Sequence, residues 1–217
     1  ESMLAGARIH RKIQRSMGSD YHAEVSLKYL IPMEKFDLQV EGRADGVIGG
    51  NPVTIDEIKG IYKSLEYLKE PVPVHLAQAK CYAYIYGVQN QKSEMDIQMT
   101  YVNLDTEQKL YFYEHYTIEE LTKWFGNLVL EYKKWAEFRY EWKQIRNSSI
   151  KQLQFPYEYR EGQKELAGSV YRSIFREKRL FIQAPTGTGK TLAAMFPSVK
   201  AMGEGLSDKI FYLTAKT

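Results

Sequence analysis

The sequence lacks the features that define several protein classes. Its 217 residues include one cysteine, Cys81, which excludes a disulfide framework, a four-cysteine iron–sulfur site and a cysteine-rich zinc site within this segment. No run of about 18 apolar residues occurs, so no membrane-spanning helix is expected. The first residues carry no signal-peptide pattern. The chain does not begin with Met, and we expect it to be a fragment of something longer.

Charge of one sign is also nearly absent. The chain contains 30 Lys and Arg residues and 27 Asp and Glu residues, which gives a net charge of +3. The whole chain therefore has no strong electrostatic field that would attract nucleic acid. A local basic groove stays open, since phosphates respond to local charge. The 44% hydrophobic and 26% charged fractions are those of an ordinary globular protein. The length suits one large domain, or one domain and part of another.

Hydrophobic spacing and turn signals predict an α/β order in the first two thirds of the chain. We expect a helix over 3–17, strands over 22–30, 36–47 and 53–59, a helix from Pro71 to about Tyr86, strands over 94–103 and 108–116, and a long helix from Thr117 to about Arg146. The cluster 49–52 is a turn signal, which makes 36–59 a β-hairpin with Asp45 near its turn. Thr117 and Glu120 have capping-box spacing. This order predicts an α/β sandwich.

The last third has a different pattern. Residues 147–152 are polar and predict a linker over 147–154. A helix over 161–176 and a short apolar strand over 179–184 follow. A glycine-rich loop then leads into a helix from Lys190, and 209–214 is predicted as another strand. Together these segments predict one βαβ unit with parallel strands.

A group of acidic residues in the first region suggests a metal centre. Glu57 and Lys59 alternate along one strand and face the same side, while Ile58 faces the core. Asp45 can reach that side from the preceding strand of the hairpin. Two converging carboxylates suit a hard divalent cation such as Mg²⁺, and the Ile58 carbonyl is a further oxygen ligand within reach. Lys59 can orient a water or a phosphate. Taken alone, Glu-x-Lys is a weak signal that arises constantly by chance.

Two further pairs strengthen this interpretation. Gln78 and Tyr82 are four residues apart on the next helix, hence on one face, and His10 follows Gly6 by four on the first helix. With these pairs the sequence resembles the RecB-like branch of the PD-(D/E)xK nucleases over residues 3–145.

That resemblance implies a restriction-endonuclease-like mixed sheet flanked by helices. It implies that His10, Asp45 and Glu57 are metal ligands and that Lys59 is the catalytic lysine. It also implies that Gln78 and Tyr82 position DNA near the scissile phosphate. The four cysteines of many relatives are absent, which affects none of these residues.

Each residue also has a simpler interpretation. His10 could be a surface histidine, Tyr82 a core residue and Gln78 a solvated helix residue. Asp56 points to the opposite side of its strand and is excluded from the site. Glu24, at the start of the first strand, is an additional candidate.

A phosphate-binding loop occupies Ala184–Thr191. It matches the Walker A pattern except that Ala replaces the first Gly, and a strand before and a helix after are the required context. The backbone N–H groups of the loop, over Thr186, Gly187, Thr188 and Gly189, would hold phosphates. Lys190 would reach the β- and γ-phosphates of ATP, and Thr191 would hold Mg²⁺.

The amino-acid sequence of this loop is similar to that of superfamily 2 helicases. Together with its flanking segments, it is most similar to the DinG/XPD branch. Residues 157–163 resemble their Q motif, which implies a nucleotide-binding role for Arg160 and Gln163, with Gln163 reading the adenine edge. Residues 212–217 resemble motif Ia, which touches the nucleic-acid backbone. The resemblance implies a partial P-loop, RecA-like βαβ unit. No Walker B acid follows, so efficient ATP hydrolysis by this chain is not expected.

These resemblances predict a nuclease domain over 1–146, a linker over 147–154 and a truncated helicase domain over 155–217. They imply a bacterial, cytoplasmic nuclease–helicase fusion that cleaves DNA with Mg²⁺ or Mn²⁺, an exonuclease acting on single-stranded or free ends, and ATP as the second ligand. No membrane contact is expected.

Two alternatives remain at this stage. The first region could be a catalytically inactive nuclease-fold module that binds DNA and loads an ATP-dependent helicase. The whole chain could also be a plain P-loop ATPase whose first region serves interaction.

Overall fold

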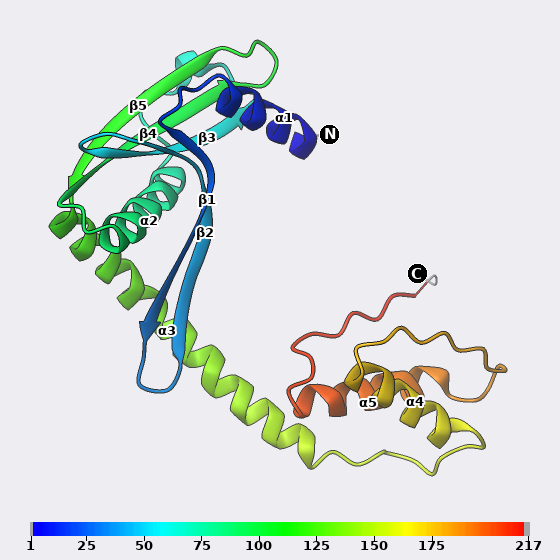
Figure 1. Cartoon of the computed structure of the whole chain (residues 1–217). Helices are drawn as coiled ribbons and strands as arrows, with labels where there is room; N and C mark the ends of the chain where they lie inside the picture. Colours follow the sequence, from blue (N-terminus) through cyan, green and yellow to red (C-terminus); the bar gives the residue numbers. More distant parts are fainter. Residues whose placement is uncertain (1, 215–217) are drawn as a thin grey trace. The chain divides into compact units, whose positions relative to one another are not determined.

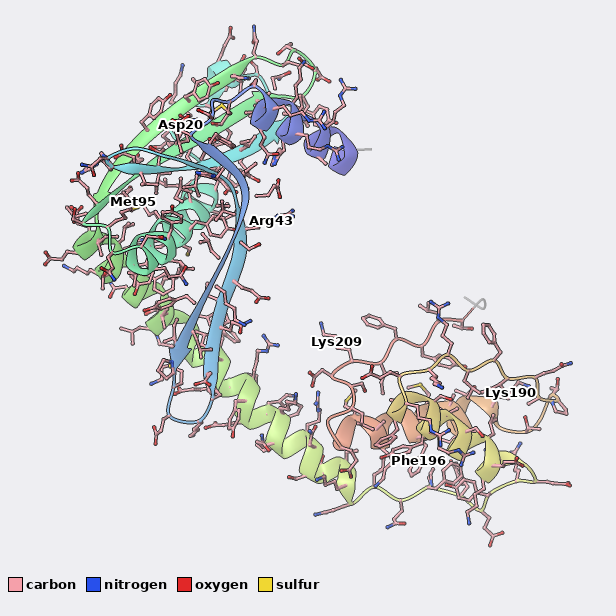
Figure 2. The ribbon with its side chains drawn as sticks, in the orientation of Figure 1. Asp20, Arg43, Met95, Lys190, Phe196 and Lys209 are labelled. Atoms are coloured by element: carbon pink, nitrogen blue, oxygen red, sulfur yellow. The ribbon has the colours of Figure 1, made fainter. Side chains whose placement is uncertain are left out.

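The computed structural model describes residues 2–214, with side chains from Gly6 onward. The chain divides into two compact units, Glu1–Lys134 and Trp135–Thr217, shown in Figure 1. Figure 2 places Met95 in the interior of the first unit and Phe196 among the helices of the second. The two units are described separately below.

The first unit is built on one five-stranded sheet with the strand order β1-β2-β3-β4-β5. Its strands are β1 (Tyr21–Pro32), β2 (Asp37–Ile48), β3 (Val53–Ile61), β4 (Glu94–Asn103) and β5 (Lys109–Thr117). All neighbours are antiparallel except β3 and β4. That parallel pair needs a crossover, which the short helix η1 (Leu65–Tyr67) and α2 (Pro73–Gln89) supply.

Helices lie on both faces of this sheet. Ala79 and Ala83 of α2 pack in the main core with Ile55 of β3. On the opposite face, α1 (Ser2–Arg15) packs through Ile9 and Ile13 against a smaller cluster that includes Ile58. Because side chains alternate along a strand, β3 contributes to both clusters. The mixed α/β architecture predicted from the sequence is therefore confirmed for this unit.

The capping box before α3 (Ile118–Lys151) is also confirmed. The N–H of Thr117 donates to Glu120 Oε2 at 2.9 Å, and the N–H of Glu120 donates to Thr117 Oγ1 at 3.2 Å. These bonds satisfy two backbone donors that the start of a helix leaves free.

The second unit comprises the C-terminal part of α3, α4 (Gln163–Phe175) and α5 (Lys190–Gly203). The linker prediction was wrong for 147–151, which continue α3. Tertiary contacts overcome the polar sequence here: Lys200 Nζ donates to the carbonyls of Ile150 and Lys151 at 3.3 and 2.9 Å, so α5 caps the end of α3. A Cβ on Gly203 would lie 2.4 Å from Ile150, so Gly203 allows this close approach.

The strands predicted over 179–184 and 209–214 are not present within residues 2–214, so the βαβ unit was wrong in its strands. An apolar pattern predicts burial but supplies no hydrogen-bonding neighbour, and these segments do not pair with each other. Most of their side chains are exposed, to 92% at Phe181 and 89% at Leu213. Residues 215–217, which complete the motif Ia resemblance, lie outside the described part of the chain. None of the helices among residues 2–214 has the length and apolar character needed to cross a bilayer.

Candidate functional site

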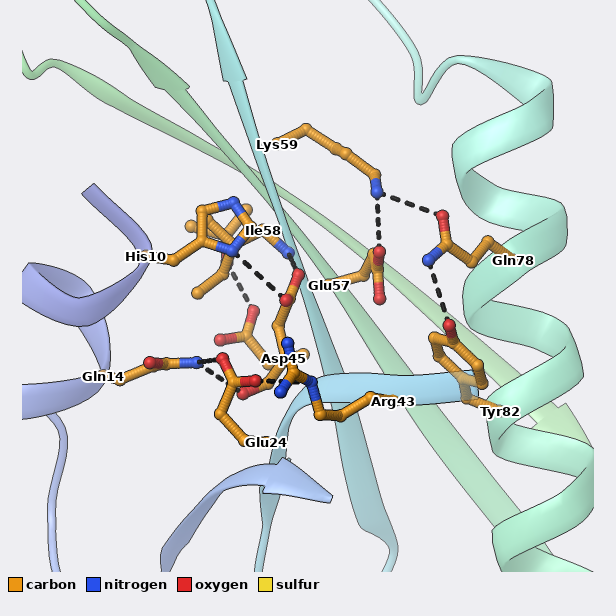
Figure 3. A network of polar contacts seen from close by, with 12 residues as sticks. His10, Gln14, Glu24, Arg43, Asp45, Glu57, Ile58, Lys59, Gln78 and Tyr82 are labelled. Atoms are coloured by element: carbon orange, nitrogen blue, oxygen red, sulfur yellow. Dashed lines mark hydrogen bonds and ion pairs between the residues drawn. The ribbon is translucent and has the colours of Figure 1, made fainter. Parts of the chain in front are cut away.

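The candidate metal centre lies where β2 and β3 separate. The two strands pair only over Gly46–Ile48, and Gly46 opposite Asp56 is the last pair. Asp45 and Glu57 are the next residues on each strand, so the split leaves both carboxylates at an open fork. Figure 3 shows this fork, with α1 on one side and α2 on the other.

Asp45 replaces a missing ladder contact at the fork. Its Oδ2 accepts the N–H of Ile58 at 2.8 Å, and its Oδ1 lies 3.2 Å from His10 Nδ1 on α1. This hydrogen bond raises the pKa of His10. Within a strand, the N–H and C=O of one residue point to the same edge, so the Ile58 carbonyl is directed toward the fork as well.

The second half of the site is a hydrogen-bonded chain from β3 to α2. Lys59 Nζ donates to Glu57 Oε1 at 2.7 Å and to Gln78 Oε1 at 3.0 Å. Gln78 Nε2 then donates to the hydroxyl of Tyr82 at 3.1 Å. Gln78 and Tyr82 face the site together because they are one helical turn apart. The structure thus brings four of the predicted residues into one continuous network (Figure 3).

Glu57 is the most constrained group in the network. The residue is 1% exposed, and burial, followed by the charge of Asp45, raises its pKa to about 7. Its Oε1 accepts from Lys59, but among the described residues its Oε2 is the one buried side-chain oxygen or nitrogen without a hydrogen-bond partner.

These donors fit a divalent cation in part. An unpartnered carboxylate oxygen and a second carboxylate at the same fork are hard oxygen donors of the kind that Mg²⁺ and Mn²⁺ take. No group of three His, Cys, Asp or Glu side chains within residues 2–214 is gathered closely enough to form a ready-made metal site. His10 is directed at Asp45, and Glu57 is directed at Lys59.

Sequence reasoning missed the residues that support Asp45 on the side away from the fork. Tyr21 donates its hydroxyl to Asp56 Oδ2 at 2.9 Å and lies 3.4 Å from the Asp45 carbonyl. Asp56 is fully buried, and burial raises its pKa. Thr100 and Gln98 donate to its other oxygen at 2.6 and 3.1 Å. Asp56 does face away from the fork, as expected, but its position between Ile55 and Glu57 gave no sign of a supporting role.

Two glycines make room for tyrosine rings near the fork. A Cβ on Gly46 would lie 2.0 Å from the Tyr21 hydroxyl, and one on Gly42 would lie 2.6 Å from that of Tyr82. By contrast, a Cβ on Gly6 would meet nothing within 4 Å, so packing in the described protein does not require glycine there.

The additional candidate Glu24 lines the same hollow as Asp45. It accepts from Gln14 Nε2 at 2.9 Å and pairs with Arg43 at 2.6 Å. Gln14 also donates to the Asp45 carbonyl at 2.9 Å. Glu24 has a φ of 58°, a left-handed conformation that is uncommon outside glycine. It therefore stands beside the fork and is connected to Asp45 through Gln14.

The glycine-rich loop of the second unit is followed by α5, as a phosphate loop requires, but no strand precedes it among the described residues of this unit. Gly187 and Gly189 have φ values of 90° and 71°, which favour glycine. Thr188 Oγ1 donates to the Pro185 carbonyl at 3.0 Å. Lys190 opens α5 and donates to the carbonyls of Ala184 and Pro185 at 3.0 and 2.7 Å, so its ammonium group spans the loop. A helix N-terminus at this point favours an anion.

Arg160 and Gln163 hold this loop in place. Gln163 accepts the N–H of Arg160 at 3.0 Å and donates to the Gly189 carbonyl at 3.2 Å. The Arg160 guanidinium donates to the Gly187 carbonyl. Thr191 Oγ1 lies 3.2 Å from the hydroxyl of Tyr212. The structure therefore brings the predicted nucleotide-binding residues together. The side-chain amide of Gln163 bonds to backbone groups of Arg160 and Gly189. Thr186 lies in the same turn.

One comparison with known proteins concerns this second site. Residues 161–215 match the DEAD/DEAH box helicase family. This part of the chain is helicase-like, and the match implies binding of ATP and nucleic acid. No curated protein matches the chain. A solved structure titled "Crystal structure of SSO0001" aligns at 18% identity with a TM-score of 0.38. The alignment covers 56% of this chain and 55% of that one, so the match spans about half of each.

Proposed function

We propose that residues 1–146 are a RecB-like PD-(D/E)xK nuclease domain that hydrolyses DNA phosphodiester bonds with Mg²⁺ or Mn²⁺. Residues 155–217 would be the beginning of a DinG/XPD-like superfamily 2 helicase, which follows the end of α3 at Lys151. The observation that carries the proposal is the network from Glu57 through Lys59 and Gln78 to Tyr82, beside an Asp45 carboxylate and an unpartnered oxygen of Glu57.

In this proposal Asp45 and Glu57 hold the cation, with the Ile58 carbonyl and His10 at the same edge. A divalent cation held by these residues would supply a water of lowered pKa and would offset charge on the phosphoryl group. Lys59 is held by Glu57 and Gln78, so its ammonium group is positioned before substrate arrives. Gln78 and Tyr82 then present hydrogen-bonding groups along the α2 side of the fork, where a DNA backbone can be oriented.

The helicase-like neighbour favours a substrate with a single-stranded or free end, because unwinding would deliver such an end. By analogy between families, we propose an exonuclease in DNA repair or processing.

The test is degradation of end-labelled single-stranded and duplex DNA in Mn²⁺. We expect the wild-type chain to cleave and Asp45→Ala to lose cleavage. Asp37→Ala, at the exposed far end of the same strand, is the matched control and should cleave like wild type. Equal cleavage by wild type and Asp45→Ala would reject the proposal.

The absence of a ready-made three-ligand cluster among the described residues keeps one alternative open, an inactive nuclease-fold module that binds DNA and loads the helicase. Titration with Mn²⁺ by calorimetry separates the two. A nuclease should bind Mn²⁺ through Asp45 and Glu57, and the binding should weaken in Asp45→Ala. A module without catalytic function should give the same signal with both proteins.

A further inference from the structure

The exposed side of α1 is strongly basic. Ile9 and Ile13 bury one side of this helix, each at 4% exposure, and the helix contains no acidic residue. The other side carries four cations spaced by three or four residues, which places them along one face. This basic face consists of Arg8, Arg11, Lys12 and Arg15. All four are exposed, and together they line a hollow on the surface.

Little negative charge opposes this face. Glu107 pairs with Lys12 and lies 3.9 Å from Arg8. Arg11 and Arg15 form no ion pair with any residue of the described chain. One carboxylate against four cations leaves a local excess of positive charge, even though the chain as a whole is near neutrality.

The basic face continues into the fork. Arg11 lines the surface hollow of the basic face and also a second hollow, of about 750 Å³, that reaches His10 and Asp45. With a rise of 1.5 Å per residue, the face extends over roughly 10 Å. That length corresponds to about three phosphates of one DNA strand at 3.4 Å each.

We propose that the basic face of α1 binds the phosphate backbone of a DNA strand and directs that strand toward the fork at Asp45. Delivery of the strand to the fork rests on the proposed nuclease function. The binding itself follows from charge, exposure and continuity with the site. Arg11 and Arg15 carry most of it, since Glu107 already occupies the other two cations.

The experiment measures binding without cleavage. Fluorescence anisotropy of a labelled single-stranded 20-mer in EDTA is followed between 50 and 200 mM salt for the full chain and for Arg11→Ala/Arg15→Ala. Lys28→Ala/Lys123→Ala removes the same charge from exposed positions on β1 and α3 and is the matched control. Circular dichroism melts check that each variant is folded.

We expect Arg11→Ala/Arg15→Ala to weaken binding about tenfold at 100 mM salt. It should also reduce the slope of log K against log salt by about 1.4, since each lost contact to single-stranded DNA contributes about 0.7. The control should change affinity less than about twofold. Identical behaviour of the two double variants would overturn the proposal.

Three further outcomes distinguish this proposal from binding of other polyanions and from the proposed nuclease function. Displacement of the 20-mer by poly-glutamate as readily as by unlabelled DNA would overturn the assignment to nucleic acid. If the wild type binds through α1 but never cleaves in Mn²⁺, the proposed nuclease function fails while the basic face stands. If it cleaves and the Arg variant binds normally, the reverse holds.

Discussion

Glu57 combines a buried carboxyl with a neighbouring carboxylate, and its pKa of about 7 makes stability depend on pH. The carboxyl of an unfolded Glu has a pKa of about 4.3. Between this pH and about pH 7, the folded protein therefore holds a proton on Glu57 that the unfolded chain has released. The free energy of unfolding therefore falls as the pH rises from about 4.5 toward 7. His10 acts in the same direction, because the stability from its raised pKa is lost as the pH rises through the folded value.

From this we predict that Glu57→Gln, in EDTA at pH 8, raises the free energy of unfolding by about 1–3 kcal/mol, because it removes a buried charge. Urea denaturation at pH 5 and pH 8 measures the effect, and the difference between the two pH values should shrink in the variant. Mn²⁺ should stabilise the wild type more than the variant. Glu70→Gln, at an exposed loop position, should alter neither. A variant less stable than wild type at pH 8 would contradict this account of Glu57.

The ammonium group of Lys59 donates hydrogen bonds to Glu57 and Gln78. It has no free lone pair, so it is not a metal ligand. We predict that Lys59→Ala reduces cleavage by at least about 100-fold, the usual loss when a group that stabilises the transition state is removed. Mn²⁺ affinity, measured by calorimetry, should change less than about threefold. Loss of Mn²⁺ binding in this variant would reject the role assigned to Lys59.

At the scale of the elements, the approach of α2 to β2 depends on a glycine. The ring of Tyr82 lies over Gly42, where a Cβ would come within 2.6 Å of its hydroxyl. We predict that Gly42→Ala moves this ring, breaks the bond to Gln78 and slows cleavage about tenfold, at a cost of about 1–3 kcal/mol in stability.

The control for this change is Gly126→Ala within α3, where a Cβ would meet nothing within 4 Å. That substitution should stabilise the protein by about 0.5–1 kcal/mol, since Ala favours a helix over Gly, and should leave cleavage unchanged. Thermal melts and cleavage assays on both variants provide the comparison. Normal cleavage by Gly42→Ala would show that the position of the Tyr82 ring is unimportant.

The accuracy of sequence-based prediction follows from the kind of contact involved. Alternation and capping are local, so the strands around Asp45 and the start of α3 directly after Thr117 could be predicted. The end of α3 could not, because it depends on Lys200, which is distant in sequence. The segments 179–184 and 209–214 were predicted as strands because their apolar pattern resembles one, while strand formation needs a partner.

The same distinction applies to the candidate site. The spacing of Glu57 with Lys59 and of Gln78 with Tyr82 places each pair on one face, which sequence alone can indicate. The bond from Lys59 to Gln78 joins β3 to α2 and depends on their packing. The support of Asp45 by Tyr21 and Asp56 depends on the register of β1 against β2, and no local pattern records it.

At the scale of the whole molecule, the two candidate sites belong to different compact units. The fork lies in the first unit and the glycine-rich loop in the second, so their chemistry should be separable by substitution. A plain P-loop ATPase with a non-catalytic first region would not give this separation.

We predict that Lys190→Ala weakens binding of a fluorescent ATP analogue at least tenfold. A charge-assisted contact contributes roughly 1.5–3 kcal/mol, and about 1.4 kcal/mol corresponds to a factor of ten. The same variant should retain Mn²⁺-dependent DNA cleavage, and Asp45→Ala should lose cleavage while binding the analogue normally. Lys178→Ala, an exposed lysine of the second unit, should keep both activities. Loss of both in either single variant would indicate that the two sites act as one, and cleavage that depends only on Lys190 would assign the chemistry to the second unit.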